Sequence, residues 1–158
     1  PARGVAPTGR AMTSPVIDAG DGLPLTVPAL LGARVDDRPD DPAAVAESLT
    51  GSPYLWGGNS RAGIDCSGLV QAALLACGVP CPGDSDLQEQ ALGRPLGPEE
   101  GIARNDLLFW KGHVAIALSS TDMIHANAHH MAVRSEPIAG AITRIAAAGG
   151  GEPRIRRL

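Results

Sequence analysis

The segment GIDCSGLVQAALLACG, residues 63–78, places a cysteine at the point where a turn becomes an apolar helix. Asp65 is a residue type favoured at a helix N-cap, and apolar side chains follow it at helical spacing. Gly78 and Pro80 end this helix. Cys66 therefore lies in the first turn, where unpaired N–H groups and the helix dipole favour a thiolate. The Asp65 carboxylate opposes thiolate formation, so position alone leaves a nucleophile and a buried structural cysteine as equal alternatives.

The chain has three cysteines, which cannot all pair with one another. Cys66 and Cys77 would stand about 16 Å apart on one helix, whereas a disulfide needs α-carbons within about 7 Å. Cys77 and Cys81 could meet only if the turn between them bends sharply. We therefore interpret Cys77 and Cys81 as small apolar residues that fill the core.

Composition indicates an acidic globular domain. The 158 residues are 44% hydrophobic and 19% charged, with a net charge of −4. This length suffices for one domain with a core of its own. The charge disfavours a nucleic-acid partner, which selects basic surfaces, and no apolar run approaches the roughly 20 residues of a membrane span.

The sequence divides near residue 40. Residues 1–40 are rich in Pro and Gly, contain no aromatic residue, and are too few to bury a core alone. We interpret them as an extended arm that packs on the rest, or as the remnant of a preceding module. Residues 41–158 are expected to form the main domain.

An α+β fold is predicted for this domain, with helices first and an antiparallel meander second. Helices are expected over about 42–49, 66–77 and 138–148, with a shorter one within GDSDLQEQALG, residues 83–93, capped by Asp84 or Ser85. Short strand-like runs, separated by turn residues, are DLLFW (106–110), HVAIALS (113–119), DMIHANA (122–128), MAVRSEPI (131–138) and the C-terminal segment to residue 158.

Two histidines lie in neighbouring strand-like runs, His113 at the start of one and His125 within the next. A hairpin tip near Ser119 or Ser120 would place residue 113 opposite residue 125 or 126, whereas a later tip would separate the two rings. A cysteine activated by one histidine, which a second polar residue orients, is an arrangement for nucleophilic catalysis. Cys66, His113 and His125 are therefore a candidate triad.

A zinc site is the alternative for the histidines. The segment HANAHH gives His125 and His129 the i, i+4 spacing of a zinc-binding helix. However, Ala126 stands where that motif has its Glu, and the segment has the pattern of a strand and a turn. We therefore expect no metal, and we expect His129 and His130 at a surface corner.

All four aromatic residues lie shortly before the candidate cysteine or the first candidate histidine. Trp56, Phe109 and Trp110 are expected in the core. Tyr54 carries a hydroxyl that needs a partner when buried, which suits the wall of a cleft near Cys66.

Four segments, in this order, resemble the NlpC/p60 cysteine peptidases of bacteria: PYLWGGNSRAGIDCSGLVQAAL, PGDSDLQ, NDLLFWKGHVAIAL and MIHANAHHMAV. The YxWGG loop, the DCSG helix start, the GHV strand and the IHA strand occur at family-like intervals. The resemblance covers about residues 41–158 and is strongest to alphaproteobacterial members. Residues 1–40 match nothing complete, although many relatives carry a Src-homology-3-like barrel on that side.

The resemblance implies a papain-like α+β fold, with the nucleophile at a helix N-terminus against an antiparallel sheet. It implies a peptidase that cleaves peptidoglycan stem peptides between γ-D-glutamate and a diamino acid such as meso-diaminopimelate, without a metal or an organic cofactor. By position, Cys66 corresponds to the nucleophile, His113 to the general base and acid, and His125 to the third polar residue. Tyr54 corresponds to the tyrosine near the thiolate.

The resemblance also implies a substrate pocket. In relatives that require a free N-terminal L-alanine, the Asp and Ser that flank the cysteine and a later Ser line the amine-binding pocket. Asp65, Ser67 and Ser85 occupy these positions here. The implied partners are stem peptides or muropeptides, and both the cytoplasm and the cell envelope remain possible compartments.

Two alternatives remain. The same fold hosts thiol amidases and acyltransferases, so the fold does not determine the reaction. A non-catalytic wall-binding module is the second alternative. An intact Cys-His-His set argues against a pure binding module, which has no need for all three.

Overall fold

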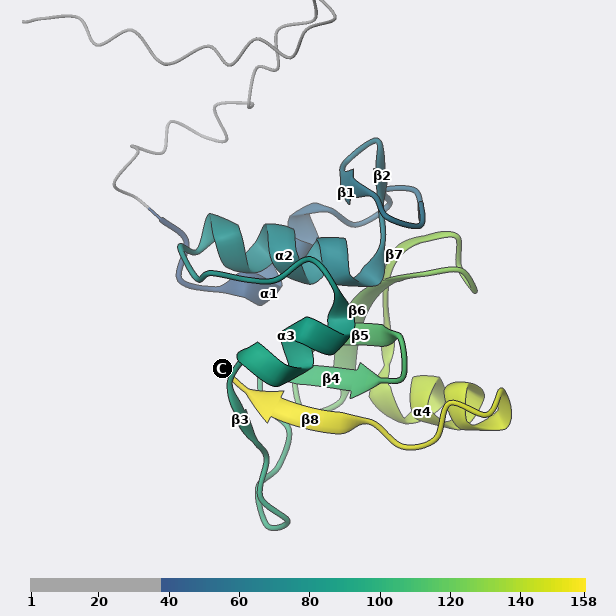
Figure 1. Ribbon diagram of the computed structural model, residues 1–158. Coiled ribbons are helices and arrows are strands. Elements are labelled where there is room, and N and C mark those ends of the chain that lie inside the picture. The colour runs from purple at the N-terminus through teal and green to yellow at the C-terminus, as the bar shows by residue number, and fades with distance from the viewer. Residues whose placement is uncertain (1–37) are drawn as a thin grey trace, which may run out of the picture. The chain divides into compact units, whose positions relative to one another are not determined.

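An antiparallel sheet organises residues 38–158, the part of the chain that the computed structural model describes (Figure 1). Its strands are β3 (Arg94–Pro95), β4 (Leu107–Trp110), β5 (His113–Ala117), β6 (Asp122–Asn127), β7 (Ala132–Pro137) and β8 (Arg154–Arg157). Their order across the sheet is β3-β8-β4-β5-β6-β7, and every neighbouring pair is antiparallel. The arm or module expected at residues 1–40 lies outside the described residues, apart from 38–40.

Four helices accompany the sheet: α1 (Pro42–Ser48), α2 (Cys66–Ala76), α3 (Ser85–Ala91) and α4 (Ile138–Ala147). A short ribbon of β1 (Asn59–Ser60) and β2 (Gly63–Ile64) leads into α2. These helices and the α+β class confirm the prediction. The short strands β1, β2 and β3 were not predicted, since two residues are too few to show an alternating pattern.

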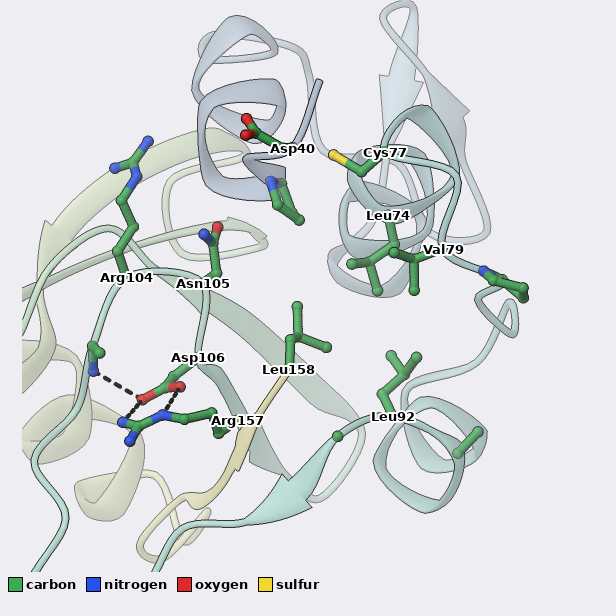
Figure 2. Close-up of a pocket in the computed structure, with 15 residues that line it drawn as sticks. Asp40, Leu74, Cys77, Val79, Leu92, Arg104, Asn105, Asp106, Arg157 and Leu158 are labelled. Atoms are coloured by element: carbon green, nitrogen blue, oxygen red, sulfur yellow. Dashed lines mark hydrogen bonds and ion pairs between the residues drawn. The ribbon is translucent and has the colours of Figure 1, made fainter. Parts of the chain in front are cut away.

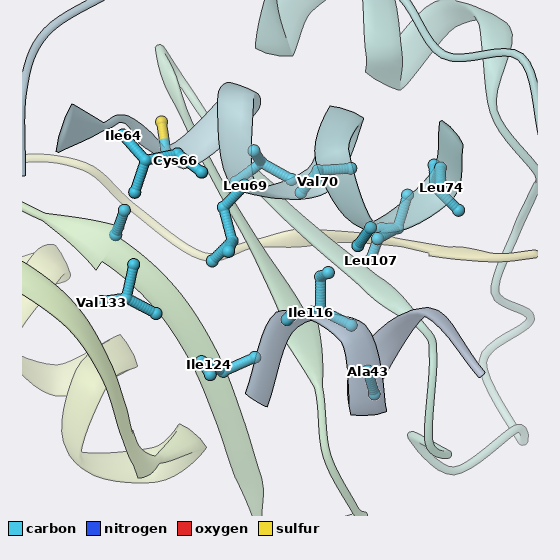
Figure 3. Close-up of a cluster of buried hydrophobic side chains, with 14 of the residues drawn as sticks. Ala43, Ile64, Cys66, Leu69, Val70, Leu74, Leu107, Ile116, Ile124 and Val133 are labelled. Atoms are coloured by element: carbon cyan, nitrogen blue, oxygen red, sulfur yellow. The ribbon is translucent and has the colours of Figure 1, made fainter. Parts of the chain in front are cut away.

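The larger core lies between the sheet and the helices α1 and α2 (Figure 3). Leu69 and Leu74 of α2 are buried against Leu107, Ile116 and other apolar residues of the sheet. Full burial of one such side chain is worth about 1.5–3 kcal/mol relative to exposure. Because α2 is held along its length by this core, the position of its first residue is fixed as well.

A second core covers the opposite face of the sheet. Leu108, Trp110 and Ala115 pack there with Ile138 and Ala141 of α4. Consecutive residues of a strand point to opposite faces, which is why β4 and β5 contribute side chains to both cores. The sheet is therefore covered on both faces, which suits four consecutive buried residues in β4.

The cysteines are free. Cys81 packs against the larger core, as predicted, and burial raises the pKa of its thiol to about 11. Cys77 is half-buried at the C-terminal cap of α2 and does not belong to the core, so the prediction that it fills the core is wrong.

The first turn of α2 contacts the glycine loop that precedes it. A Cβ atom at Gly68 would lie 2.3 Å from the carbonyl oxygen of Gly58, a distance that no packed side chain can adopt. Glycine at this position lets the two backbones approach closely. The helix start and the loop are therefore packed as one unit.

Substitution of Gly68 by Ala is expected to lower the free energy of unfolding by about 1–3 kcal/mol, because the new methyl group overlaps the Gly58 carbonyl. Gly140 offers a matched control: like Gly68, it is the third residue of its helix, but a Cβ atom there meets nothing within 4 Å. Gly140→Ala is expected to raise stability by about 0.5–1 kcal/mol. Urea denaturation of both variants measures the two effects, and equal signs would contradict the close packing at Gly68.

Candidate active site

The Asp65 carboxylate holds the start of α2 against the glycine loop. Its Oδ1 accepts the N–H of Gly68 at 2.7 Å and the hydroxyl of Ser67 at 3.1 Å. Its Oδ2 accepts the N–H of Gly57 at 2.8 Å. Asp65 is thus the predicted N-cap, and it also ties the loop to the helix. The backbone on both sides of Cys66 is fixed as a result.

Cys66 has 9% of its surface exposed, and it belongs to the larger core at the N-terminal end of α2 (Figure 3). Burial is the main influence and raises the pKa of the Cys66 thiol, and the charge of Asp65 acts in the same direction. The N–H groups of Val114, Ser67 and Cys66 itself lower that pKa. Burial therefore outweighs the effect of the first helical turn, and the pKa of the thiol lies above its ordinary value.

His113 and His125 form a hydrogen-bonded pair. His113 Nε2 lies 2.7 Å from His125 Nδ1, and the ring centroids are 5.0 Å apart. The predicted register was wrong: Ala117 pairs with Met123, and the same register continued along the strands places His113 opposite Asn127. The rings still meet, because residues two apart on one strand share a face and diagonal neighbours are within reach.

Glu136 and Arg144 extend the hydrogen bonding of this pair. His125 Nε2 lies 2.6 Å from Glu136 Oε1, and the Arg144 guanidinium donates to the same oxygen. Sequence reasoning missed both residues. The pairing of His125 with Arg134 across β6 and β7 brings Glu136 to the same face, so a correct hairpin register would have identified it.

Both imidazoles are neutral at physiological pH. Burial is the main influence and lowers the pKa of His113 and of His125 to about 3. The positive charge of Arg144 lowers both values further, whereas the negative charge of Glu136 raises that of His113. A neutral imidazole has one N–H donor and one nitrogen with a lone pair, so one ring donates and the other accepts in the hydrogen bond between them.

This burial makes stability depend on pH. The unfolded chain binds protons on these two rings below about pH 6.5, whereas the folded chain does so only near pH 3, so stability is present above pH 6.5 and lost as the pH falls. The free energy of unfolding is expected to fall by up to about 1.4 kcal/mol per pH unit for each ring. Urea denaturation between pH 7 and pH 4.5 measures the slope.

A matched pair of variants isolates the contribution of the buried rings. His125→Gln is expected to make the slope shallower, whereas Gln90→Ala is expected to leave it unchanged, because Gln90 is exposed and carries no titratable group. An identical slope in wild type and His125→Gln would contradict the buried neutral state.

The thiol approaches the histidine pair at the beginning of β5. The N–H of Val114 faces the Cys66 sulfur, and Val114 directly follows His113. Val114 belongs to the larger core, whereas the His113 ring lies beside the Trp110 ring, with centroids 5.8 Å apart. Within residues 38–158, no hydrogen bond joins the Cys66 sulfur to the His113 ring. The structure therefore brings His113 to His125, and brings Cys66 to the backbone next to His113.

A cavity of about 450 Å³ opens at Cys66. It is lined by residues of the glycine loop, the start of α2, the start of α3 and the β4–β5 turn: Tyr54, Trp56, Gly57, Asp65, Cys66, Ser67, Asp84, Ser85, Asp86, Leu87 and Gly112. All four residues predicted for the cleft wall and the substrate pocket line this cavity: Tyr54, Asp65, Ser67 and Ser85. The cavity also contains two carboxylates that the sequence argument did not assign to the site, Asp84 and Asp86.

The two aromatic side chains that line the cavity, Tyr54 and Trp56, differ in their exposure. Burial raises the pKa of Tyr54, and negative charge at Cys66 and Asp65 acts in the same direction, so the hydroxyl stays protonated and can donate a hydrogen bond. Trp56 is 83% exposed at the rim. The prediction that Trp56 belongs to the core is wrong, because it stands on the protruding glycine loop, whereas Phe109 and Trp110 are buried as predicted.

Gln88 anchors α3 beside the cysteine. Its Nε2 donates to the carbonyl oxygens of Ser67 and Pro82, each at 2.9 Å, and the side chain is fully buried. These bonds connect the loop before α3 with the first turn of α2. The acidic end of α3 is therefore held over the cavity.

A larger cavity lies elsewhere (Figure 2). Its volume is about 880 Å³, and Leu74 and Cys77, at the opposite end of α2 from Cys66, line it together with the Asp106–Arg157 ion pair. None of the predicted catalytic residues reaches it. We therefore assign the candidate active site to the smaller cavity, where the thiol lies.

One group of side chains in the described residues has the spacing of metal ligands. Ligand atoms of His125, His130 and Glu136 lie within 4.8 Å of one another. Arg144 already donates to Glu136 and places a positive charge at this point, which opposes cation binding. His129 and His130 lie in the β6–β7 turn, as predicted.

Comparison with known proteins relates the chain to one family. The sequence profile of the NlpC/P60 family matches residues 51–146. Dipeptidyl-peptidase 6 of Lysinibacillus sphaericus is 42% identical over 84 residues, which cover 52% of this chain and 30% of that protein. The γ-D-glutamyl-L-lysine dipeptidyl-peptidase of Bacillus cereus is 30% identical over 107 residues, which cover 63% of this chain and 32% of that protein. The chain thus spans about a third of these curated relatives.

Among solved structures, the chain is similar to the peptidoglycan hydrolase RipB of Mycobacterium tuberculosis. The TM-score is 0.61 at 33% sequence identity, and the match covers 73% of this chain and 62% of that one. This similarity confirms the predicted fold, with helices on an antiparallel sheet. None of the helices within residues 38–158 is long and apolar enough to cross a membrane.

Proposed function

Because the chain belongs to the NlpC/P60 family, we propose that it is a cysteine peptidase acting on peptidoglycan stem peptides. The proposed bond joins the γ-carboxyl of D-glutamate to a diamino acid, meso-diaminopimelate or L-lysine. One observation carries the proposal: a cysteine at a capped helix start lies against the backbone of β5 next to His113, which is hydrogen-bonded to His125 of β6, and the cysteine lines an acidic cavity. The names of the two curated relatives support the same chemistry.

In the proposed mechanism, His113 is the general base. Its Nε2 is engaged with His125, so Nδ1, the ring nitrogen nearer its own backbone, is the one available to the thiol. The Cys66 thiol transfers its proton to Nδ1, and the sulfur attacks the γ-glutamyl carbonyl carbon. Since both groups are neutral beforehand, the ion pair forms only during the reaction.

The remaining steps follow from the same groups. The N–H of Cys66 and the Tyr54 hydroxyl stabilise the oxyanion. The tetrahedral intermediate expels the amine of the diamino acid, which takes the proton from His113, and a thioester with Cys66 remains. Water then attacks the thioester while His113 accepts its proton, the thiol is regenerated, and the glutamyl carboxylate is released.

The acidic cavity favours a substrate with a free amine. Asp65, Asp84 and Asp86 line it, and none of the described residues around it is Lys, Arg or His. An ammonium group is attracted to such a site, and charge-assisted hydrogen bonds to carboxylates are the stronger kind. We therefore propose that Asp65, with Ser67 and Ser85, binds the ammonium of an N-terminal L-alanine.

The direct test uses L-Ala-γ-D-Glu-meso-diaminopimelate and its L-lysine analogue, with products identified by mass spectrometry. Wild type is expected to release the L-Ala-D-Glu dipeptide and the free diamino acid. Cys66→Ala is expected to release neither, whereas the matched control Cys81→Ala keeps the activity. Survival of these peptides and of intact wall fragments would contradict the peptidase, and a new amide product would indicate an acyltransferase.

Acetylation of the substrate amine tests the acidic cavity separately. The N-acetyl tripeptide is expected to be cleaved with a kcat/KM about tenfold to a hundredfold lower, because it offers no charge to the carboxylates. An equal kcat/KM for the free and acetylated peptides would show that the amine is not recognised. That outcome would leave the peptidase in place and point to internal wall peptides as substrates.

A further inference from the structure

We propose that Glu136 and Arg144 are positioning residues, which fix the tautomers of His125 and His113 so that the His113 lone pair faces Cys66. This inference rests on the proposed function, because it concerns the base of that reaction. Neither residue touches the cavity at Cys66, so each would act through the histidine pair.

The contacts form one chain. Arg144 of α4 donates to Glu136 Oε1, which lies 2.6 Å from His125 Nε2, and His125 Nδ1 lies 2.7 Å from His113 Nε2. The His125 side chain is fully buried, and that of Glu136 is 14% exposed. Packing therefore fixes the His125 end of the arrangement.

This series of hydrogen bonds permits one set of proton positions on the two histidines. A carboxylate only accepts hydrogen bonds, so a neutral His125 must carry its proton on Nε2 to bond Glu136. His125 Nδ1 is then an acceptor, which requires the proton of His113 on Nε2. The lone pair of His113 is thereby left on Nδ1, the nitrogen that would accept the thiol proton. With the opposite tautomers, Nδ1 would carry a proton and could not act as a base.

Glu136 also supplies charge. Its carboxylate raises the proton affinity of His113, whereas Arg144 lowers it. When His113 accepts the thiol proton, the nearby carboxylate stabilises the imidazolium. Arg144 keeps the carboxylate in place, because its guanidinium bonds the same oxygen that accepts from His125.

Other titratable groups lie around the two histidine rings. Both rings line a small cavity together with Lys111 of the β4–β5 turn, His129 and Arg144. His130 lies edge-on to His125. Among the described residues, Glu136 is the one carboxylate bonded to either ring. Loss of this carboxylate therefore removes the acceptor that selects the tautomer.

Alkylation of Cys66 by iodoacetamide tests the proposal without any peptide substrate. The rate at Cys66 is followed by mass spectrometry of the peptide that contains it, between pH 5 and pH 9, in wild type, Glu136→Gln, Glu136→Asp and Glu136→Ala. Gln and Ala are expected to lower the rate at pH 7 about tenfold to a hundredfold, whereas Asp, which keeps the carboxylate, restores part of it. The pH at which the rate rises is expected to shift in the Gln variant.

Glu89→Gln is the matched control. Glu89 accepts from Arg154 at 2.7 Å in an equivalent ion pair, on α3 and away from the histidines. Its alkylation rate is expected to stay within twofold of wild type. Nitrogen-15 NMR of the imidazoles gives a second readout: wild type is expected to show both histidines protonated on Nε2, and a His113 proton on Nδ1 would overturn the proposal.

The outcomes separate this inference from the proposed function. A reduced alkylation rate in Glu136→Gln supports the positioning role even if wild type cleaves none of the tested peptides. Rates within twofold of wild type in folded Gln and Ala variants would overturn it, even if the enzyme is an active peptidase.

Discussion

The remaining features of the site depend on one carboxylate at one helix start. Asp65 caps α2, binds the Ser67 hydroxyl and holds the N–H of Gly57, so helix and loop move together. Gly68 lets the two backbones touch, since any side chain there would overlap the loop. Burial raises the pKa of the Cys66 thiol, and the charge of the same carboxylate acts in the same direction. Because the pKa of the thiol is raised, the proposed reaction needs a base close to it.

The sheet supplies that base from buried strands. Burial lowers the pKa of His113 and of His125, which costs stability in acid and, with the hydrogen bonds of the pair, leaves the lone pair of His113 Nδ1 free at neutral pH. In the proposed reaction the charge appears only when the proton moves, at a point where Glu136 can stabilise it. The carboxylates of the cavity at Cys66 have a separate role in the proposed reaction, in which they bind the amine of the substrate.

The sequence predicted the parts that depend on local signals. The Asp65 cap, the four helices, the central strands and the positions of Tyr54 and Ser85 beside Cys66 agree with the structure. The parts that depend on register were not predictable. The histidines pair diagonally, and Glu136 reaches them through a hairpin whose register no local pattern specifies. The prediction for Trp56 was wrong because its residue type is typical of a core, whereas its position on the glycine loop leaves it exposed.

The central claim is that Cys66 forms a thioester with the γ-carbonyl of D-glutamate. Cleavage of L-Ala-γ-D-Glu-meso-diaminopimelate in the presence of hydroxylamine tests it most directly, because hydroxylamine intercepts an acyl-enzyme even when it does not accumulate. The account predicts that L-Ala-D-Glu γ-hydroxamate forms alongside the free acid, at a ratio that rises with hydroxylamine concentration, while release of the diamino acid continues. Release of the free acid alone, at every hydroxylamine concentration, would contradict the thioester and the role of Cys66 as nucleophile.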